Sequence, residues 1–436
     1  MPDKKTIARQ IFEETLDSIS IPRVLQSKLQ FIQNELVLPE CSVDLSHIDA
    51  FRVIAIGKAA HAMVDGLAAV LPTGLKMDGI VSAPTKPGTA LPGIQYFVSG
   101  HPIPNIESWR SAEAILELLR TSNERTLVFF LLSGGASALC EFPLDREMTM
   151  EDVQAMHLAL VTCGAPIDAI NTVRKHLSAV KGGRLTVAAG KARKITLAVT
   201  DVPAGKEWAL ASGPTLPDPT TVEDVDHVFA QYDLRARLPA AVLRWVERQM
   251  PETPKHSHAA FANADFVVLL GMHDLFHSAH HAAEAHGYIT RCDNSTDDWQ
   301  VGKAVDSLLA QLEEWKRANA GHKVALIADG EVACPVTGKG TGGRNSAFVL
   351  DSVPKIAGKN ITVLSAGTDG IDGNSRAAGA VADGNTLAQA LARDLDPGFY
   401  FEQSDAFTFF NAMEDAVMTG PTGNNLRDLR IFLAEP

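Results

Sequence analysis

The chain has 436 residues, of which 46% are hydrophobic and 21% are charged. This composition is typical of folded globular proteins and excludes wholesale disorder, and at about 150 residues per domain the length predicts two or three domains. Lys and Arg number 39 against 52 Asp and Glu, a net charge of −13, so the overall field disfavours binding to nucleic acid or an anionic membrane. Any anionic substrate therefore requires a local concentration of positive charge.

The cysteines and the apolar segments indicate the compartment. The five cysteines are scattered without a CxxC pair, which argues against a disulfide framework or a zinc knuckle and favours a reducing environment. The first 20 residues lack the apolar core of a signal peptide. The longest apolar runs, residues 127–132 and 266–270, are too short to cross a bilayer. We therefore expect a cytoplasmic protein with no membrane partner.

Short runs of β-branched and aliphatic residues recur, each followed by a polar turn and a helical pattern. The clearest runs are residues 53–56, 127–132, 195–199, 324–328 and 361–364. Apolar strands that alternate with helices predict an α/β fold with mainly parallel sheets covered on both faces, in which ligands bind beyond the carboxyl ends of the strands. The proline-containing polar segment 250–259 predicts a boundary between domains at residues 1–250 and 260–436.

Two turns after the first strands are candidates for anion binding. Lys58 begins a helix after Ile56-Gly57, where its charge opposes the local helix dipole and so indicates an anionic ligand. Ser133, Gly134, Gly135 and Ala136 follow the run 127–132, and such a turn brings helix N–H groups close to a phosphate or carboxylate. An ordinary tight turn explains the second segment equally well.

The segment from Ile170 to Arg184 predicts an amphipathic helix with a positive stripe. Its apolar residues recur at helical spacing, while Asn171, Lys175 and Ser178 share another face with Arg174 and Lys181 beside them. A solvated helix face is the usual meaning of a charge run. The neighbouring amide and the absence of intervening acids keep anion binding open as the alternative.

Histidines are concentrated between residues 273 and 286. His277 and His281 are four residues apart on an expected helix, but the segment has no HExxH pattern and no acid at a suitable spacing. We therefore expect a polar helix face rather than a metal site. The chain also lacks the GxSxG motif of a nucleophilic hydrolase.

A glycine-rich loop lies at residues 338–345, Gly-Lys-Gly-Thr-Gly-Gly-Arg-Asn. Gly338, Gly340 and Gly343 satisfy the dinucleotide pattern GxGxxG, but the preceding strand ends far upstream and the next strand-end acid comes late. The loop with its two cations fits a triphosphate better. The predicted nucleotide-binding residues are Lys339, Gly340, Gly342, Gly343 and Asn345.

Acids follow three of the expected strands. Asp201, Glu331 and Asp369 each stand at or near a strand end, with Asp372 close behind. Such acids can hold Mg²⁺ or accept a proton from a substrate hydroxyl, although a single Asp there is more often a turn former or a helix cap. We expect these three acids to meet at one sheet edge and to be the metal ligands.

Seven segments occur in the order of a known family. They are IGKAAHAM, SGHPIPN, LLSGGASAL, INTVRKHLSAVKGGRL, TDVPAGKEWALASGPT, GKGTGGRN and SAGTDGIDGN, followed by TGPTGNN near the end. Together they resemble the glycerate 2-kinase family, whose C-terminal part is the MOFRL-type domain. The resemblance covers nearly the whole chain, and seven collinear motifs are far more specific than one.

The resemblance implies both a fold and an activity. It implies a Rossmann-like N-terminal αβα domain, a second three-layer α/β domain, and catalysis in the cleft between them. It implies phosphorylation of the 2-hydroxyl of D-glycerate, which requires ATP and Mg²⁺ and gives 2-phosphoglycerate and ADP. The residues that match the proposed catalytic positions are Lys58, Asp201, Arg344 and Asp369.

The residues suggest how the roles divide, since phosphoryl transfer needs mostly positioning and charge neutralisation. We expect Lys58 and Arg344 to neutralise the transferring group, and Asp201 to orient or deprotonate the hydroxyl or to share Mg²⁺ with Asp369. Residues 133–136 with Asn171, Arg174 and Lys175 would hold the glycerate carboxylate or a phosphate; which loop holds glycerate and which holds ATP stays open.

Two other functions compete. Members of this family are also named hydroxypyruvate reductase, so an NAD(P)H-dependent reductase is the alternative enzyme. Its only dinucleotide motif is badly placed in the sequence. A sensor that binds a sugar acid or a nucleotide would keep the anion loops without needing the strand-end acids. The expected partners are small molecules, and either a monomer or an oligomer is compatible with the sequence.

Overall fold

The computed structural model describes residues 3–72, 74–200, 202, 205–248, 250–424 and 426–436. It divides into two compact units, which we call unit 1 (Met1–Ser20 and Leu270–Pro436) and unit 2 (Ile21–Leu269). This division differs from the predicted one, because the first helix belongs with the C-terminal residues. It also differs because strand β9 (Ala264–Leu270), beyond the predicted linker, joins the sheet of unit 2.

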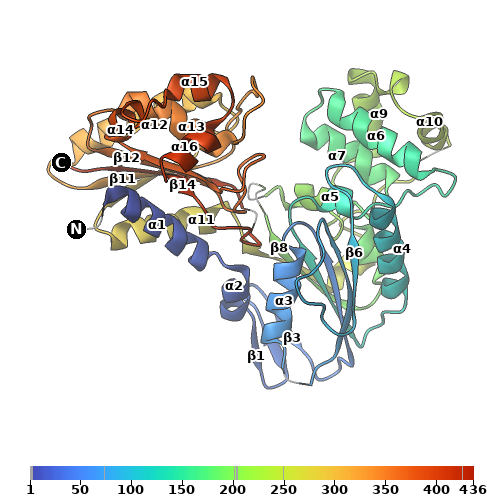
Figure 1. Cartoon of the computed structure of the whole chain (residues 1–436). Coiled ribbons are helices and arrows are strands. Elements are labelled where there is room, and N and C mark those ends of the chain that lie inside the picture. The colour runs from blue at the N-terminus through green and yellow to red at the C-terminus, as the bar shows by residue number, and fades with distance from the viewer. Residues whose placement is uncertain (1–2, 73, 201, 203–204, 249, 425) are drawn as a thin grey trace. The chain divides into compact units, whose positions relative to one another are not determined.

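Unit 2 is built on a six-stranded sheet (Figure 1). Its strands lie in the order β6-β5-β4-β7-β8-β9, which becomes 3-2-1-4-5-6 when they are numbered along the chain, the order of doubly wound nucleotide-binding sheets. The pairings from β6 to β8 are parallel, as predicted. The bounds are β4 (Ala50–Ile56), β5 (Met77–Ala83), β6 (Ile94–Val98), β7 (Thr126–Leu132) and β8 (Arg193–Val199). All seven residues of β7 are buried, because helices cover both faces.

Helices pack on this sheet and also form a second core in unit 2. The helices against the sheet are α3 (Ala60–Val70), α4 (Ile106–Arg120), α5 (Ala136–Leu139) and α8 (Arg184–Ala188). A separate cluster, which the sequence did not predict, joins α6 (Met150–Thr162), α7 (Ile167–Leu177), α9 (Val222–Gln231) and α10 (Ala240–Glu247). The remaining elements include α2 (Ile21–Lys28), the antiparallel strands β1 (Gln30–Ile32), β2 (Glu35–Val37) and β3 (Ser42–Asp44), and short 3₁₀ turns including Glu207–Ser212.

Unit 1 also has a six-stranded sheet, but a mixed one. Its order is β10-β11-β15-β12-β13-β14, where only β10 and β11 pair in parallel and the other four pairings are antiparallel. The bounds are β10 (Ile289–Asp293), β11 (Val324–Asp329), β12 (Ile361–Gly367), β13 (Gly379–Asp383), β14 (Ala416–Val417) and β15 (Asp428–Ala434). The α/β class is therefore as predicted, but this sheet departs from the mainly parallel pattern because β15 enters antiparallel between β11 and β12.

The helices of unit 1 complete three layers. Figure 1 shows α1 (Lys4–Ser18) and α11 (Met272–Ala285) on one face of the sheet. The other face carries α12 (Val301–Ala318), α13 (Arg344–Ile356), α14 (Thr386–Leu391), α15 (Pro397–Glu402) and α16 (Ala406–Ala412). The apolar face of α1, with Ile11 and Phe12 fully buried, explains why this N-terminal helix belongs to the C-terminal unit.

Candidate active site

The turns after β4 and β7 interlock in unit 2. These two strands are neighbours at the point where the strand order reverses, which is where doubly wound sheets bind ligands. The Lys58 amide donates to the Gly134 carbonyl, and the Ala59 amide donates to the Oγ of buried Ser133. A Cβ on Gly57 would lie 2.1 Å from that Oγ, so the turn requires glycine here. The Lys58 side chain itself is exposed.

His101 joins this pair of turns. A Cβ built on Gly135 would lie 3.0 Å from the His101 ring and 3.3 Å from the side chain of Lys58, so the three residues are close neighbours. Burial and the charge of Lys58 lower the pKa of His101, which keeps its imidazole neutral at pH 7. The sequence offered one signal for this residue, its position in the motif SGHPIPN, but no role followed from it.

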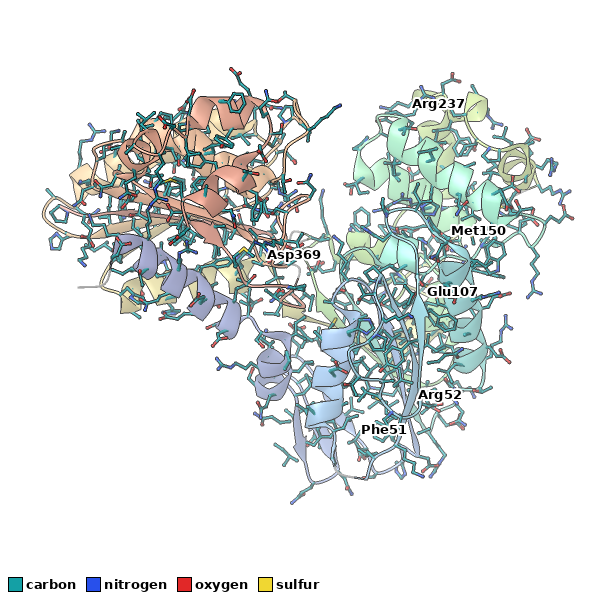
Figure 2. The ribbon with its side chains drawn as sticks, viewed as in Figure 1. Phe51, Arg52, Glu107, Met150, Arg237 and Asp369 are labelled. Carbon is teal, nitrogen blue, oxygen red and sulfur yellow. The ribbon has the colours of Figure 1, made fainter. Side chains whose placement is uncertain are left out.

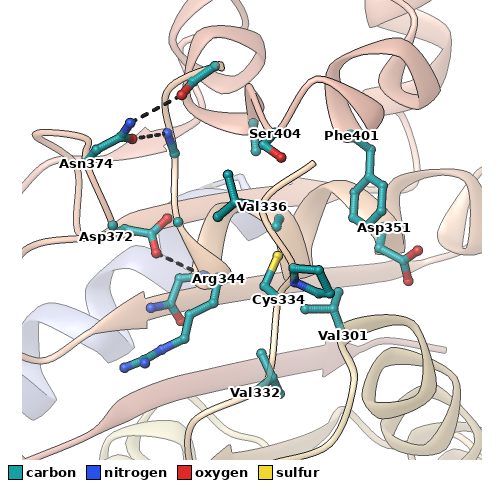
Figure 3. A pocket seen from close by; sticks show the side chains of 18 of the residues that line it. Val301, Val332, Cys334, Val336, Arg344, Asp351, Asp372, Asn374, Phe401 and Ser404 are labelled. Carbon is teal, nitrogen blue, oxygen red and sulfur yellow. Dashed lines mark hydrogen bonds between the residues drawn. The ribbon is translucent and has the colours of Figure 1, made fainter. Parts of the chain in front are cut away.

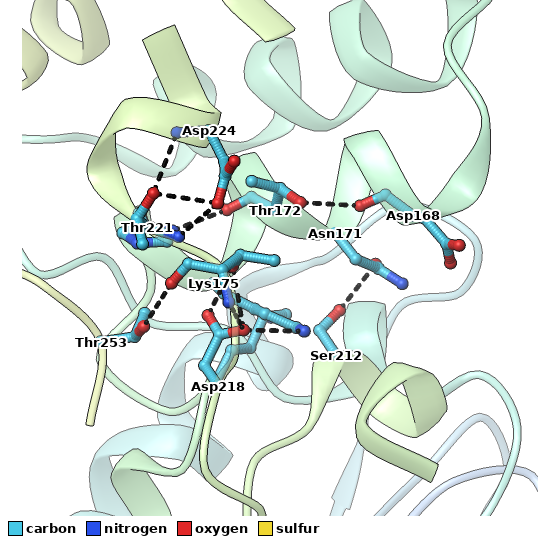
Figure 4. Close-up of polar contacts among 12 residues, drawn as sticks. Asp168, Asn171, Thr172, Lys175, Ser212, Asp218, Thr221, Asp224 and Thr253 are labelled. Atoms are coloured by element: carbon cyan, nitrogen blue, oxygen red, sulfur yellow. Dashed lines mark hydrogen bonds and ion pairs between the residues drawn. The ribbon is translucent and has the colours of Figure 1, made fainter. Parts of the chain in front are cut away.

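Helix α7 buries the polar residues of its middle and last turns, whereas Asp168 in its first turn stays partly exposed (Figure 4). The Ser212 Oγ donates to the Asn171 Oδ1 at 2.9 Å and also lies 2.9 Å from the Ser137 Oγ. Ala211 and Ser212 both have left-handed backbone, φ +55° and +60°, a strained arrangement typical of functional sites. This chain of hydroxyls fixes the amide of Asn171.

The cations of the predicted stripe are buried, and two of them are ion-paired. The Lys175 Nζ lies 3.2 Å from the Asp218 carboxylate and over the ring of Trp208. Lys181 pairs with Glu141. Arg174 is 7% exposed, and its Nε has no hydrogen-bond partner among the described residues. The solvated-face interpretation is therefore wrong, and among these three cations Arg174 is the one without a recorded ion pair in the described part of the chain.

The buried carboxylate of Glu141 interacts with three buried basic side chains of unit 2, those of Lys181, His157 and Arg174. Burial alone would raise its pKa, but Lys181 and His157 outweigh that effect and lower the pKa to about 2. The His157 Nε2 lies 3.1 Å from the carboxylate. Burial lowers the pKa of Arg174, and the charge of Glu141 partly offsets the effect.

In unit 1 the predicted loop 338–345 borders a cavity of about 900 Å³, within the size range of small-molecule sites. Gly340, Gly342, Gly343 and Asn345 line it, whereas Lys339 is exposed on the same loop and is not among the described lining residues. Asn345 is held by the Ser365 hydroxyl at 2.6 Å. The structure thus brings four of the five predicted nucleotide-binding residues to one cavity.

The glycines of this loop serve the packing of the protein itself. A Cβ on Gly338 would lie 2.1 Å from the Gln403 carbonyl oxygen, and one on Gly340 would lie 2.3 Å from the Asp405 Cβ. The amides of residues 340–343 donate to Gln403, Asp405, Asn374 and Ser346. Residues 340–343, as the structure describes them, therefore offer a phosphate no backbone N–H group that is not already bonded within the protein.

Asp372 caps helix α13. Its carboxylate accepts the amides of Asn345 and Ser346 at 2.9 Å and the Ser346 hydroxyl at 2.6 Å. The start of α13 is therefore already occupied by a carboxyl group of the protein. This arrangement does not fit a dinucleotide fingerprint, in which the pyrophosphate occupies the helix N-terminus.

Arg344, at the start of α13, is oriented by two carboxylates. It donates to both oxygens of Asp428, at 2.5 and 3.3 Å, and to Glu331 at 2.8 Å. Burial would lower the pKa of Arg344, but these acids outweigh it and raise the pKa above its ordinary value. A guanidinium has five N–H donors, and the three used leave two without a partner among the described residues.

The structure does not bring the three predicted metal ligands to one sheet edge, because Glu331 and Asp369 follow strands β11 and β12 of the unit 1 sheet, whereas β8, the strand before Asp201 in the sequence, belongs to the sheet of unit 2. Asp369 lines the cavity just beyond β12 (Figure 2), where its Oδ1 accepts the Ile371 amide at 3.0 Å. Glu331 is engaged by Arg344. Asp201 lies outside the described residues. Among the described residues, no group of three or more His, Cys, Asp or Glu side chains could hold a metal ion, and this includes the histidines of α11.

Sequence reasoning missed Asp428 as well as His101. Asp428 is 3% exposed at the start of β15, between Arg344 and the fully buried Arg430. The sequence pattern that could have revealed Asp428 is the alternation Asp-Leu-Arg-Ile, which places two charges on one face of an otherwise apolar strand.

All five cysteines are free thiols. No helix among the described residues is long and apolar enough to span a membrane.

Comparisons with known proteins place these features in a family. Residues 7–247 match a domain of unknown function, DUF4147, and residues 324–428 match the MOFRL family. A D-glycerate 2-kinase of Thermotoga maritima is 32% identical over 406 residues, which cover 92% of this chain and 95% of the relative. A glycerate 2-kinase of Pyrococcus horikoshii is 32% identical over 87% of this chain and 86% of its own.

A solved structure agrees. The crystal structure of a Thermotoga maritima glycerate kinase matches with a TM-score of 0.86 and 31% identity, covering 99% of each chain. A relative from Agrobacterium vitis, 34% identical over 87% of this chain and 86% of its own, carries only a provisional hydroxypyruvate reductase name. The reductase alternative is therefore not favoured. By its sequence and its fold, the chain belongs to the glycerate 2-kinase family.

Proposed function

We propose that this protein is a glycerate 2-kinase, which transfers the γ-phosphoryl group of ATP to the 2-hydroxyl of D-glycerate. The observation that carries the proposal is the cavity of unit 1, where Arg344 with two spare N–H groups, Asp369 and the predicted loop residues line one space. Arginine in this geometry suits the oxygens of a phosphate. The kinase relatives in bacteria and archaea support the same activity.

The reaction forms a bond between the glycerate 2-oxygen and the γ-phosphorus, and it breaks the bond from that phosphorus to the bridging oxygen, which leaves with ADP. Lys58 and Arg344 neutralise the charge on the transferring group, and Asp201 accepts or orients the proton of the hydroxyl. These roles rest on charge and position: Lys58 is exposed at the switch point of one sheet, and Arg344 lines the cavity of the other unit.

The described residues of the cavity can bind Mg²⁺ only with help from the substrate, through a carboxylate together with phosphates and waters. Mg²⁺ is usually held by one or two carboxylates together with substrate phosphates and waters, and Asp369 provides a carboxylate beside the cavity. We propose that Asp369 holds the ion and that Glu331 instead orients Arg344. Bound there, the ion would neutralise the phosphate oxygens.

The glycerate site is proposed in unit 2. Asn171 is fixed by Ser212, Arg174 lacks a recorded ion pair in the described part of the chain, and Lys58 lies beside the residues 133–136. Residues 133–136, Asn171 and Arg174 would hold the carboxylate of glycerate, and Lys58 beside them would face the transferring phosphoryl group. Lys175, which is paired with Asp218, would contribute through the local field rather than through direct contact.

The function is tested by two parallel incubations. One contains ATP, Mg²⁺ and D-glycerate, and the other contains hydroxypyruvate with NADH or NADPH. The proposal predicts ADP formation that depends on glycerate in the first incubation and no loss of absorbance at 340 nm in the second. Oxidation of the nicotinamide cofactor without ADP formation would reverse the assignment, and tight ligand binding without turnover would indicate a sensor.

A further inference from the structure

Helix α13 forms one wall of the unit 1 cavity. Arg344, Ala347 and Asp351 all line it, at spacings of three and seven residues that place them on one helix face. Seven residues at 1.5 Å per residue separate Arg344 from Asp351 by about 10 Å along the axis. The small side chain of Ala347 leaves the middle of the wall open.

The two ends of the cavity differ in chemistry. Figure 3 shows Arg344, Asp372 and Asn374 on one side and Val301, Phe401 and Asp351 on the other, with Cys334 and Val336 between them. Arg344 is the one cationic side chain among the described lining residues. Val336 is 83% exposed and Phe401 is 37% exposed, so a flat apolar group bound here would bury their apolar surface.

Asp351 is the charged group at the apolar end. Its Oδ2 accepts a hydrogen bond from Lys355 at 2.6 Å, and its carboxylate has no other recorded hydrogen bond within the described part of the chain. Lys355 also lies 2.7 Å from Asp306, so the lysine is shared between two acids. A carboxylate held in this way repels a triphosphate but accepts from an amino group.

From this polarity we propose that the apolar end of the cavity binds the adenine of ATP and that Asp351 accepts a hydrogen bond from its 6-amino group. The inference rests on the proposed kinase function and adds the orientation of the nucleotide and a residue that selects its base. The triphosphate lies toward Arg344, and the base packs between Val336 and Phe401.

The test compares ATP with purine riboside 5′-triphosphate, which lacks only the 6-amino group, as phosphoryl donors to D-glycerate. Wild-type protein is expected to prefer ATP in kcat/KM by roughly tenfold or more, because a hydrogen bond to a charged group is lost with the analogue. Asp351→Ala removes the preference. Asp351→Asn retains part of it, since its side-chain carbonyl still accepts a hydrogen bond.

The control is Asp306→Asn, which alters the other partner of Lys355 outside the cavity and keeps the wild-type preference. If Asp351→Ala does not fold, Phe401→Ala is tested in its place. We expect this variant to raise the KM for ATP several-fold. Its inhibition by inorganic tripolyphosphate, which has no base, should stay unchanged. The inference is overturned if folded Asp351→Ala still prefers ATP to the analogue as strongly as the wild type does, or if the wild type prefers GTP to ATP. In either case, glycerate-dependent turnover would leave the proposed kinase function intact. Absence of turnover with ATP in the wild type refutes the proposed function itself.

Discussion

The guanidinium of Arg344 is oriented before any substrate binds, because Asp428 and Glu331 hold three of its N–H groups. We predict that Arg344→Ala lowers kcat/KM by roughly 100-fold or more, since a preorganised donor to the developing charge is lost. The exposed Arg317 on α12 is a matched control, and Arg317→Ala should keep wild-type kinetics. Steady-state assays on folded variants check this, and near-normal turnover by Arg344→Ala would refute its role.

Glu141 provides a prediction about stability. Glu141→Gln leaves Lys181 buried without its anion, which costs about 3–5 kcal/mol of unfolding free energy at pH 7. The pKa of Glu141 is lowered in the folded protein to about 2, so its stabilisation is complete above the unfolded pKa near 4.5 and is lost as the pH falls toward 2. The gap between wild type and variant therefore narrows in acid.

Urea unfolding at pH 7 and below pH 4.5 measures that gap. The control Glu147→Gln changes a carboxylate that is exposed and bound only to exposed Arg248 in the described structure, so it should change the unfolding free energy by less than about 1 kcal/mol. A Glu141→Gln variant as stable as the wild type at pH 7 would show that Lys181 does not depend on this acid.

The motifs predicted where Lys58, Arg344 and Asp369 lie, in turns or loops beside strand ends and helix starts, while their catalytic roles stay predictions. The residues that pair with the charged side chains of the site could not be predicted. The Asp218 that neutralises Lys175 lies 43 residues away, and the Asp428 that orients Arg344 lies 84 residues away. Pairings over such separations are set by tertiary packing, which a local pattern does not encode.

At the scale of elements, the loop 338–343 depends on glycine for its contacts. A Cβ on Gly343 would lie 2.3 Å from the Asp372 carboxylate and 2.5 Å from backbone atoms of residues 372 and 373. We predict that Gly343→Ala displaces the cap of α13, lowers the thermal midpoint by several degrees and raises the KM for ATP. The control Gly398→Ala meets only the Asp396 side chain, at 3.4 Å or more, and should be tolerated. Calorimetry and kinetics compare the two variants, and equal behaviour would contradict the close packing.

Strands β4, β7, β8, β11 and β12 were predictable because each is a short, nearly continuous apolar run. Strand β15 was not predicted, because Asp428 and Arg430 interrupt its apolar pattern, and its antiparallel insertion made the unit 1 sheet mixed. The helix cluster of α6, α7, α9 and α10 also escaped prediction, since amphipathic helices do not reveal which partner they pack against.

At the scale of the molecule, α1 shows why the domain boundary was misplaced. Sequence order suggests that the first helix belongs to the first domain, whereas its buried Ile11 and Phe12 pack in unit 1 with residues more than 250 positions away. The net charge of −13 likewise describes the whole chain and does not show where individual cations lie, such as buried Arg174 and cavity-lining Arg344. The cleft between domains stays a prediction.

The central claim is a reaction at one particular hydroxyl, and phosphorus NMR of the product tests it most directly. The wild-type protein is incubated with D-glycerate, ATP and Mg²⁺, and the spectrum is compared with authentic 2-phosphoglycerate and 3-phosphoglycerate. The proposed function predicts a single new phosphomonoester resonance that coincides with 2-phosphoglycerate and grows as ADP forms. A resonance at the position of 3-phosphoglycerate, or ADP formation without any new phosphomonoester, would contradict it.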